Sequence, residues 1–277
     1  MYKILILTDF SSASNHTVAF TQALFADTAT QFYLLHAFST EPAEGFTGAF
    51  LPAEQRRLAE ESLLKLERTI TQQPVPSYHS YRTVAMLGSP VSTVDTLLAQ
   101  EYFDLVVVGA TGLGRTEFFG SVATGVVRFA NTNVLVVPAS SPIRQLERVV
   151  LATDYRSVND AESFVFLTDL VRRKAAQLTI LTIENPKQPD MKASELSHRY
   201  VLRAFDGPQI DTYSIQDEDV LRGINAYLDS HSVDLLVTLP HHKSVFDVLR
   251  KNSETRPLAY HPRVPLLALY DSPVPRE

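Results

Sequence analysis

Strand-length apolar runs recur along this chain of 277 residues and limit the folds it can adopt. Residues 4–7 (ILIL) and 105–108 (LVVV) each hold four consecutive apolar side chains. Such short continuous runs are typical of strands buried on both faces, as in a parallel sheet covered by helices. Segments with helical periodicity separate the runs, so the sequence predicts an α/β fold with helices on both faces of a parallel sheet.

The first half of the chain predicts alternating strands and helices. We expect strands at residues 3–8, 31–38, 78–85, 105–108 and 134–137. We expect helices over about 14–27, 52–73, 91–100 and 122–130. Ser11 and Ser12 are N-cap candidates for the first helix, and Gly88 and Pro90 predict the turn into the third.

The same pattern restarts after residues 138–142 (PASSP), which predict a linker. RVVLAT followed by Asp154 repeats KILILT followed by Asp9. Later segments repeat as well, namely 177–183 after 31–37, 233–237 after 103–107 and 265–269 after 133–137. We therefore expect two tandem copies of one domain, over residues 1–140 and 146–277.

A glycine-rich loop follows the strand at 105–108 and leads into a predicted helix. It holds Gly109, Gly112, Gly114 and Gly120. Such a loop lets backbone N–H groups approach an anion, and the helix N-terminus adds partial positive charge, so a phosphate or nucleotide site is one interpretation. The other is that the glycines only shape a tight connection. The string is neither a P-loop nor GxGxxG, because Glu117 replaces the last glycine.

Composition excludes several classes of function. The chain has no cysteine, which rules out disulfides and thiolate metal sites. A net charge of -6 argues against non-specific binding to nucleic acid or anionic membranes. No apolar run approaches the ~20 residues of a membrane span, and the N-terminus lacks the features of a signal peptide. We therefore expect a cytoplasmic protein.

Several motifs together resemble the UspA family of universal stress proteins, over nearly the whole chain. They are the opening ILILTDFS, LLHA in the second strand, VVVGATG with a later Gly-Ser, and VLVVP. The resemblance implies two Rossmann-like domains of the adenine nucleotide alpha hydrolase-like kind, each with a five-stranded parallel sheet of order 3-2-1-4-5. Many members bind ATP through an Asp after strand one and a G-x2-G-x9-G-(S/T) signature, whereas others bind no nucleotide.

The resemblance assigns nucleotide contacts to the ends of three strands. It implies that Asp9, with Thr8 beside it, contacts the ribose or adenine. It places Ala37 against the adenine, and Val108 and Gly109 at the border of the nucleotide. These positions would supply the sugar and base side of the site.

The phosphates would meet the glycine loop and the helix that follows it. By the resemblance, Gly112 lines the phosphate path, Gly120 and Ser121 hold the phosphates, and Val122 follows with its N–H at the helix start. Gly112 and Gly120 are separated by seven residues, however, and not by the nine of the family signature. Arg115 lies inside the loop, where it either adds charge to a phosphate or is a solvated arginine.

The second copy departs further from the signature. The segment after residue 239 has no glycine, and Asn252 replaces the glycine before Ser253. His241 and His242 either bind an anion or metal or are solvated loop residues. We expect Asp154 to cap a helix or bond to backbone, in a degenerate site that has kept its scaffold.

The sequence shows no constellation for fast catalysis. It has no GxSxG string and no cysteine, and no group of histidines and carboxylates at metal-ligand spacing. His36 stands in an apolar strand, which predicts a core residue bonded to backbone. Without a general base placed against a phosphate, we expect no catalytic residues and no metal site.

Three hypotheses follow. The leading one is a stress-response or signalling module that binds ATP or a related adenine nucleotide, with or without Mg2+, in its first domain. The alternative is a nucleotide-free interaction scaffold with an unknown protein partner, in which both sites are vestigial. The third is slow ATP hydrolysis. The family also dimerises through its last strand, so we expect residues 134–137 and 264–269 to pair within one chain.

Overall fold

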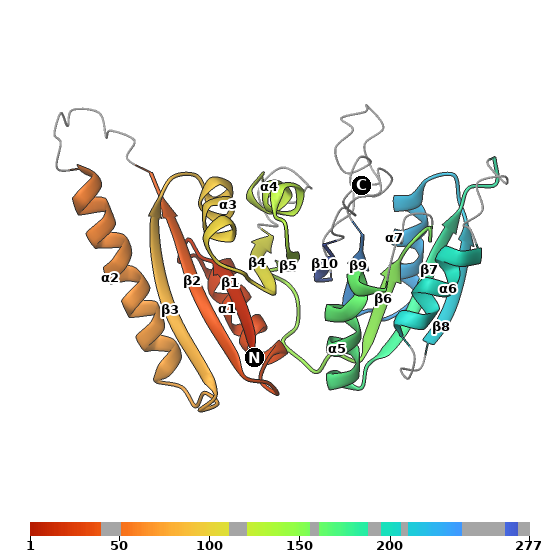
Figure 1. Cartoon of the computed structure of the whole chain (residues 1–277), viewed down its shortest axis with the longest axis horizontal. Coiled ribbons are helices and arrows are strands. Elements are labelled where there is room, and N and C mark those ends of the chain that lie inside the picture. Colours follow the sequence, from red (N-terminus) through yellow and green to blue (C-terminus); the bar gives the residue numbers. More distant parts are fainter. Residues whose placement is uncertain are drawn as a thin grey trace. The chain divides into compact units, whose positions relative to one another are not determined.

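The computed structural model describes residues 1–39, 51–110, 121–155, 161–187, 195–205, 210–239 and 264–270. The chain divides into two compact units. The first holds the described residues up to Ile143, and the second holds those from Arg144 onward. Each unit is an α/β structure of its own, coloured from red to yellow-green in the first and from green to blue in the second (Figure 1).

Five parallel strands form the sheet of the first unit. Their order is β3-β2-β1-β4-β5, which confirms the order 3-2-1-4-5. The strands are β1 (Tyr2–Leu7), β2 (Thr30–Phe38), β3 (His79–Leu87), β4 (Leu105–Ala110) and β5 (Asn133–Pro138). The helices are α1 (Ser12–Leu24), α2 (Leu51–Thr71), α3 (Pro90–Gln100) and α4 (Ser121–Phe129).

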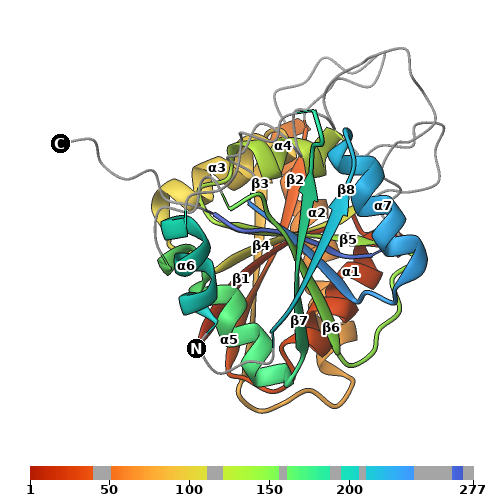
Figure 2. The same ribbon diagram turned by 90° about the vertical axis from the view of Figure 1, so that its right-hand side faces the viewer.

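The four helices cover both faces of this sheet. α1 packs on β1, β4 and β5, whereas α2 packs on β2 and β3. α3 and α4 pack against each other, with α3 on β2 and α4 on β4 and β5. Right-handed crossovers put α1 and α2 on one face and α3 and α4 on the other, because the chain moves outward from β1 to β3 and then returns to β4 and β5. Figure 2 shows the helices flanking the strands.

The apolar runs form the core, as the sequence predicts. Ile4, Leu5 and Ile6 of β1 are fully buried, and so are Val106 and Val107 of β4. β1 lies between β2 and β4, α1 packs on one of its faces, and α3 and α4 pack on the neighbouring strands β2 and β4. A central strand of this kind has no solvent side, so its side chains are continuously apolar and do not alternate.

Short polar motifs begin two of the helices. Ser11 is the N-cap of α1, and its side chain accepts a hydrogen bond from Ser14 N at 3.2 Å. Ser89 caps α3 in the same way, with Pro90 in the first turn. Gly88 precedes it with φ +139°, a conformation that favours glycine. Both helix starts agree with the sequence prediction.

The second unit repeats the topology of the first, with order β8-β7-β6-β9-β10 and all neighbours parallel. Its strands are β6 (Arg148–Ala152), β7 (Gln177–Glu184), β8 (Ile210–Gln216), β9 (Leu235–Thr238) and β10 (Leu266–Ala268). Its helices are the 3-10 turn η1 (Glu162–Phe164), α5 (Val165–Lys174), α6 (Glu195–Ala204) and α7 (Val220–Ser230). None of the described helices in either unit combines the length and the apolar character that crossing a bilayer requires.

Candidate functional site

The predicted sugar and base contacts come together at the carboxyl edge of the first sheet. β1 pairs with β2 on one side, where Leu7 lies opposite Leu35, and with β4 on the other, where Ile6 lies opposite Val107. Thr8 N continues the first ladder by donating to Leu35 O at 2.8 Å. The residues that follow these three strands therefore share one edge, the usual place for ligands in open parallel sheets.

A tight turn, residues 8–11, links β1 to α1 and is called here the β1 turn. The buried Thr8 Oγ1 accepts a hydrogen bond from Phe10 N at 3.1 Å and lies 3.2 Å from Ser14 Oγ. Phe10 has φ +62°, which is uncommon for an aromatic residue. The Thr8 side chain is thus engaged in holding the turn, and its contribution to a ligand site is to position Asp9.

Asp9 projects from this turn with an exposed side chain. Its Oδ1 accepts a hydrogen bond from Ser11 N at 3.0 Å. Partial burial pushes the pKa of Asp9 upward, but hydrogen bonds from Ser11 and Ser14 outweigh it and hold the pKa below the usual carboxyl value. The group is an ionised acceptor at neutral pH, suited to hydroxyl or amino donors and repelled by phosphate.

The end of β2 supplies an aromatic neighbour to the turn. His36 Nδ1 lies 2.8 Å from Thr8 O, which confirms the predicted bond to backbone, but the residue is half-buried at the end of β2 and not in the core. The Phe10 and His36 rings lie 4.5 Å apart between centroids. Ala37, the predicted adenine neighbour, follows His36 and is half-buried.

The end of β4 offers a different explanation for one predicted site residue. A Cβ at Gly109 would lie 2.9 Å from Thr17 Oγ1 on α1, closer than side chains normally approach. Thr17 is fully buried, and its Oγ1 donates to Ala13 O at 3.0 Å, so it has little freedom to move away. Close packing of α1 on β4 therefore accounts for Gly109 without a ligand. Val108 beside it is buried.

The phosphate half of the predicted site lies mostly outside the described residues. Gly112, Arg115 and Gly120 fall there. The described chain resumes at Ser121, where α4 begins as the sequence predicts, and Val122 lies half-buried in its first turn. N–H groups in the first turn of a helix lack intrahelical acceptors, so they are available to an anion.

The second unit has a turn with the same backbone. In register, Val149 pairs with Leu235 as Ile4 pairs with Leu105, so Thr153, Asp154 and Tyr155 correspond to residues 8–10. Tyr155 N donates to Thr153 Oγ1 at 3.1 Å, and Tyr155 has φ +60°. A left-handed φ is expected at glycine or asparagine and not at an aromatic residue, so the sequence alone does not predict it here. Only the internal repeat links the conformation of Tyr155 to that of Phe10.

The side chains around this second turn are different. Tyr155 is buried, and this burial raises the pKa of its hydroxyl, although a hydrogen bond from Thr182 acts in the opposite direction. Thr182 occupies the position on β7 that corresponds to His36 on β2. The buried Leu239 stands at the position of Gly109. Thr238 replaces Val108, and its buried Oγ1 has no hydrogen-bond partner in the described part of the chain. His241 and His242 lie outside the described residues.

Comparisons with known proteins agree with this architecture. The model of the universal stress protein family matches residues 1–138. No curated protein sequence matches the chain. A universal stress protein from Archaeoglobus fulgidus DSM 4304 is similar in structure, with a TM-score of 0.69, 14% identity and coverage of 96% of this chain and 97% of its own.

Two further solved structures are similar to this chain over different lengths. A functionally unknown protein from Pseudomonas aeruginosa PAO1 has a TM-score of 0.59 and 12% identity, covering 97% of this chain and 92% of its own. A universal stress protein in complex with cAMP has a TM-score of 0.38 and 21% identity, covering 50% of this chain and 97% of its own. At these identities, the likeness to the two long structures shows a shared fold over nearly the whole chain.

Proposed function

Because the chain belongs, through residues 1–138, to the universal stress protein family, we propose that its first unit binds ATP or a related adenine nucleotide. The chain would then act as a stress-response or signalling module in the cytoplasm. The observation that carries the proposal is Asp9, an exposed and ionised acceptor at the carboxyl edge of the sheet. The second feature that the proposal uses is the start of α4 at Ser121, because the first turn of a helix favours an anion through its N–H groups and its partial positive charge.

The charges of these two features set the direction of the nucleotide. Asp9 repels phosphate and accepts from hydroxyl groups, so the ribose belongs beside Asp9 and Thr8. The adenine then lies toward Ala37 at the end of β2, with Val108 and Gly109 at its border. The phosphates extend toward the first turn of α4, whose partial positive charge favours them.

The remaining assigned residues hold the phosphates. We assign that role to Gly112, Gly120, Ser121 and Val122 through backbone N–H groups and the serine hydroxyl, and a supporting charge to Arg115. Mg2+, where present, would offset the negative charge of the phosphates. The proposal gives the protein no catalytic residue, and slow ATP hydrolysis is the most that it allows.

We assign the second unit a supporting role. Leu239 puts a side chain where the first unit has Gly109, and the buried Tyr155 stands where Phe10 is half-buried. Both changes reduce the room for a ligand at that edge. We propose that this unit supports the first or meets a protein partner, and the pairing of residues 134–137 with 264–269 remains a prediction.

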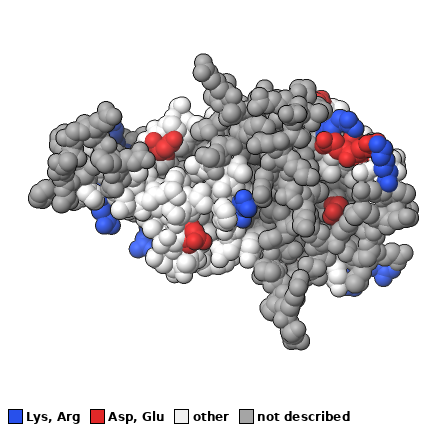
Figure 3. All heavy atoms as spheres, turned by 90° about the horizontal axis from the view of Figure 1, so that it is seen from above, with Lys and Arg blue, Asp and Glu red and all other residues white. Residues whose placement is uncertain are grey.

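A nucleotide-free interaction scaffold is the second candidate function. Two observations favour it: Gly109 is explained by the packing of α1, and the glycine spacing is seven residues instead of nine. Neither removes Asp9 or the start of α4. On the face seen from above in Figure 3, the described Lys and Arg form no continuous positive patch, because some lie singly among uncharged residues and others lie beside Asp and Glu. We therefore propose no nucleic-acid partner.

Isothermal titration with ATP, with and without Mg2+, separates these candidates. We expect the wild-type chain to bind, and Asp9→Ala and Gly120→Val to abolish the binding. Asp154→Ala is the matched control, because it removes the same carboxylate from the corresponding turn, and it should leave affinity unchanged. Absence of binding to the wild type at millimolar ATP would refute the proposal in favour of the scaffold. Phosphate release above a buffer control would be required to assign hydrolysis.

A further inference from the structure

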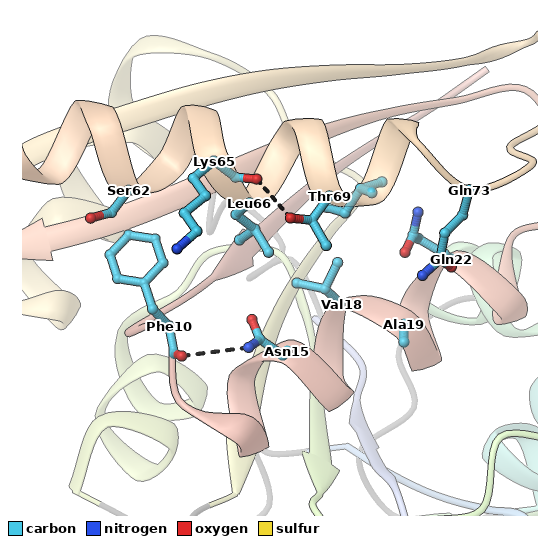
Figure 4. Close-up of a pocket in the computed structure, with 11 residues that line it drawn as sticks. Phe10, Asn15, Val18, Ala19, Gln22, Ser62, Lys65, Leu66, Thr69 and Gln73 are labelled. Atoms are coloured by element: carbon cyan, nitrogen blue, oxygen red, sulfur yellow. Dashed lines mark hydrogen bonds between the residues drawn. The ribbon is translucent and has the colours of Figure 1, made fainter.

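A groove of about 500 Å3 runs between α1 and α2 on one face of the first sheet (Figure 4). The two helices cover different strands: α1 lies on β1, β4 and β5, and α2 lies on β2 and β3. Their side chains therefore leave space between them. The volume lies within the range of about 300–1,000 Å3 that is usual for small-molecule sites.

The corresponding helices of the second unit are bridged. Thr168 on α5 donates a hydrogen bond to Ala204 O on α6 at 3.1 Å. Phe164 and Phe205, at the ends of the same segments, pack with ring centroids 5.3 Å apart and are fully buried. The same topology thus permits a closed arrangement, so the open groove is a property of the side chains in the first unit.

The lining of the groove combines an apolar floor with polar side chains. Val18 and Ile70 are buried, and Leu66 between them is half-buried. Asn15 and Thr69 are exposed at the rim. Apolar walls with a few polar groups are typical of sites for small organic molecules.

One positive charge faces this lining. Lys65 is the one ionisable side chain among the described residues of the groove, and it extends from α2 toward the space in Figure 4. No described carboxylate forms an ion pair with it, since Glu61, one turn earlier, is paired with Arg57. An unpaired ammonium beside an apolar floor favours an acidic group on the ligand.

Phe10 closes the end of the groove nearest to Lys65. Its ring lines the groove and also contacts His36, and its backbone belongs to the β1 turn. The groove therefore borders the turn that presents Asp9, on the side of α1 and α2. A ligand with an apolar body would gain an aromatic contact there.

We propose that the α1–α2 groove binds a small amphiphilic organic anion, with its acid group at Lys65 and its apolar body along Val18, Leu66 and Ile70. The six residues from Lys65 to Ile70 span about 7.5 Å along the helix axis, at about 1.5 Å for each step. That length suits a carbon chain of medium size. The site is separate from the proposed nucleotide contacts and does not depend on them.

Titration calorimetry on the full chain tests the site with octanoate, octan-1-ol and octylammonium, which share one chain and differ in charge. We expect octanoate to bind most tightly. Lys65→Gln should lower the affinity for octanoate about threefold to fivefold, which is the effect of one exposed ion pair. The affinity for octanoate should then equal the affinity for octan-1-ol. Arg68→Gln is the matched control, because it removes a positive charge from the same helix outside the groove, and it should change nothing.

Filling the groove provides a second measurement. Ala19 and Thr69 are exposed lining residues, so Ala19→Phe and Thr69→Phe add bulk without disturbing the core. Each variant that keeps the wild-type circular dichroism spectrum should lose binding of all three probes. The proposal fails if octanoate binds no better than octanol, if Arg68→Gln weakens it as much as Lys65→Gln, if a folded filled variant binds normally, or if the wild type binds none of the probes.

Discussion

Replacement of Gly109 by alanine tests whether this glycine serves packing or a ligand. The new Cβ would lie 2.9 Å from Thr17 Oγ1, and the next nearest atom, Ala13 O, would lie at an ordinary 3.7 Å. The strain is therefore concentrated on one atom. Gly109 has no left-handed φ, so alanine suits its backbone, and the clash alone should decide the outcome.

The expected magnitude combines two opposing effects. Overpacking of a well-filled core typically costs about 1–3 kcal/mol. Glycine-to-alanine changes at compatible positions gain about 0.4–1 kcal/mol, by restricting the unfolded chain. Gly109→Ala should therefore reduce the free energy of unfolding by about 1.3 kcal/mol at the middle of these ranges and by at most about 2.6 kcal/mol. In a Thr17→Ala background the obstructing oxygen is absent, so the same change should stabilise by about 0.4–1 kcal/mol.

The reversal of sign is the diagnostic result. A chain with two units need not unfold in one step, so the assay is native-state hydrogen exchange of peptides that cover β4. Four proteins are compared: wild type, Gly109→Ala, Thr17→Ala and the double variant. If the effects of the two single changes on the free energy of unfolding add to that of the double variant within about 0.5 kcal/mol, the packing explanation is refuted. Ligand binding would then be the better explanation for Gly109.

Three further predictions follow from the two turns and the second core. Asp9→Asn should lower the stability of the first unit by less than about 1 kcal/mol, since the side chain is exposed. Partial burial pushes the folded pKa of Asp9 upward, but hydrogen bonds from Ser11 and Ser14 outweigh it and hold that pKa below its usual value. Hydrogen exchange of peptides that cover α1 should therefore show the full difference above the unfolded pKa of about 3.9 and its loss as pH falls through the lower folded pKa. Thr8→Val and Thr153→Val should each lower the stability of their own unit by about 1–2 kcal/mol, because each change leaves a turn N–H without its acceptor. Serine at either position should largely preserve stability, and hydrogen exchange of α1 and α5 measures the two units separately. Gly223→Ala should lower the stability of the second unit by about 1–3 kcal/mol through overpacking, because the new Cβ would lie 2.7 Å from Ile183 Cδ1. Hydrogen exchange should show the loss of protection in α7, with exchange in the first unit unchanged.

Strands and helix starts were predictable because they depend on local signals. The continuous apolar residues of β1 and β4 need no knowledge of the fold to indicate strands buried on both faces. Ser11 and the pair Gly88 and Pro90 mark helix starts by their own chemistry. The repeat then carried these assignments into the second half, where the topology is the same.

The shape of the candidate site was less predictable, because it depends on how elements pack. Nothing local distinguishes Gly109 as a packing glycine, since the obstructing atom belongs to Thr17, which is 92 positions away along the chain. The left-handed Phe10 has no sequence signal either. The α1–α2 groove arises from which strands each helix covers, and helical periodicity does not contain that information.

The β1 turn occurs in both units, so the presence of an aspartate in it is not specific to a nucleotide site. Both units keep a threonine, an aspartate and a left-handed aromatic residue, with the same hydrogen bond from the third residue to the first. A left-handed non-glycine residue costs of order 1–3 kcal/mol, so its presence in both units indicates that the fold itself requires this turn. The turn therefore has a structural reason to exist in both units, and what carries the proposed function is the exposure of the Asp9 side chain, since Asp154 is half-buried. The units also differ at two other positions: Leu239 replaces Gly109, and the aromatic ring is buried in the second unit but half-buried in the first. The motif is common to both units, so it does not distinguish a ligand site from a scaffold. The test is whether Asp9→Ala weakens ATP binding while Asp154→Ala leaves it unchanged.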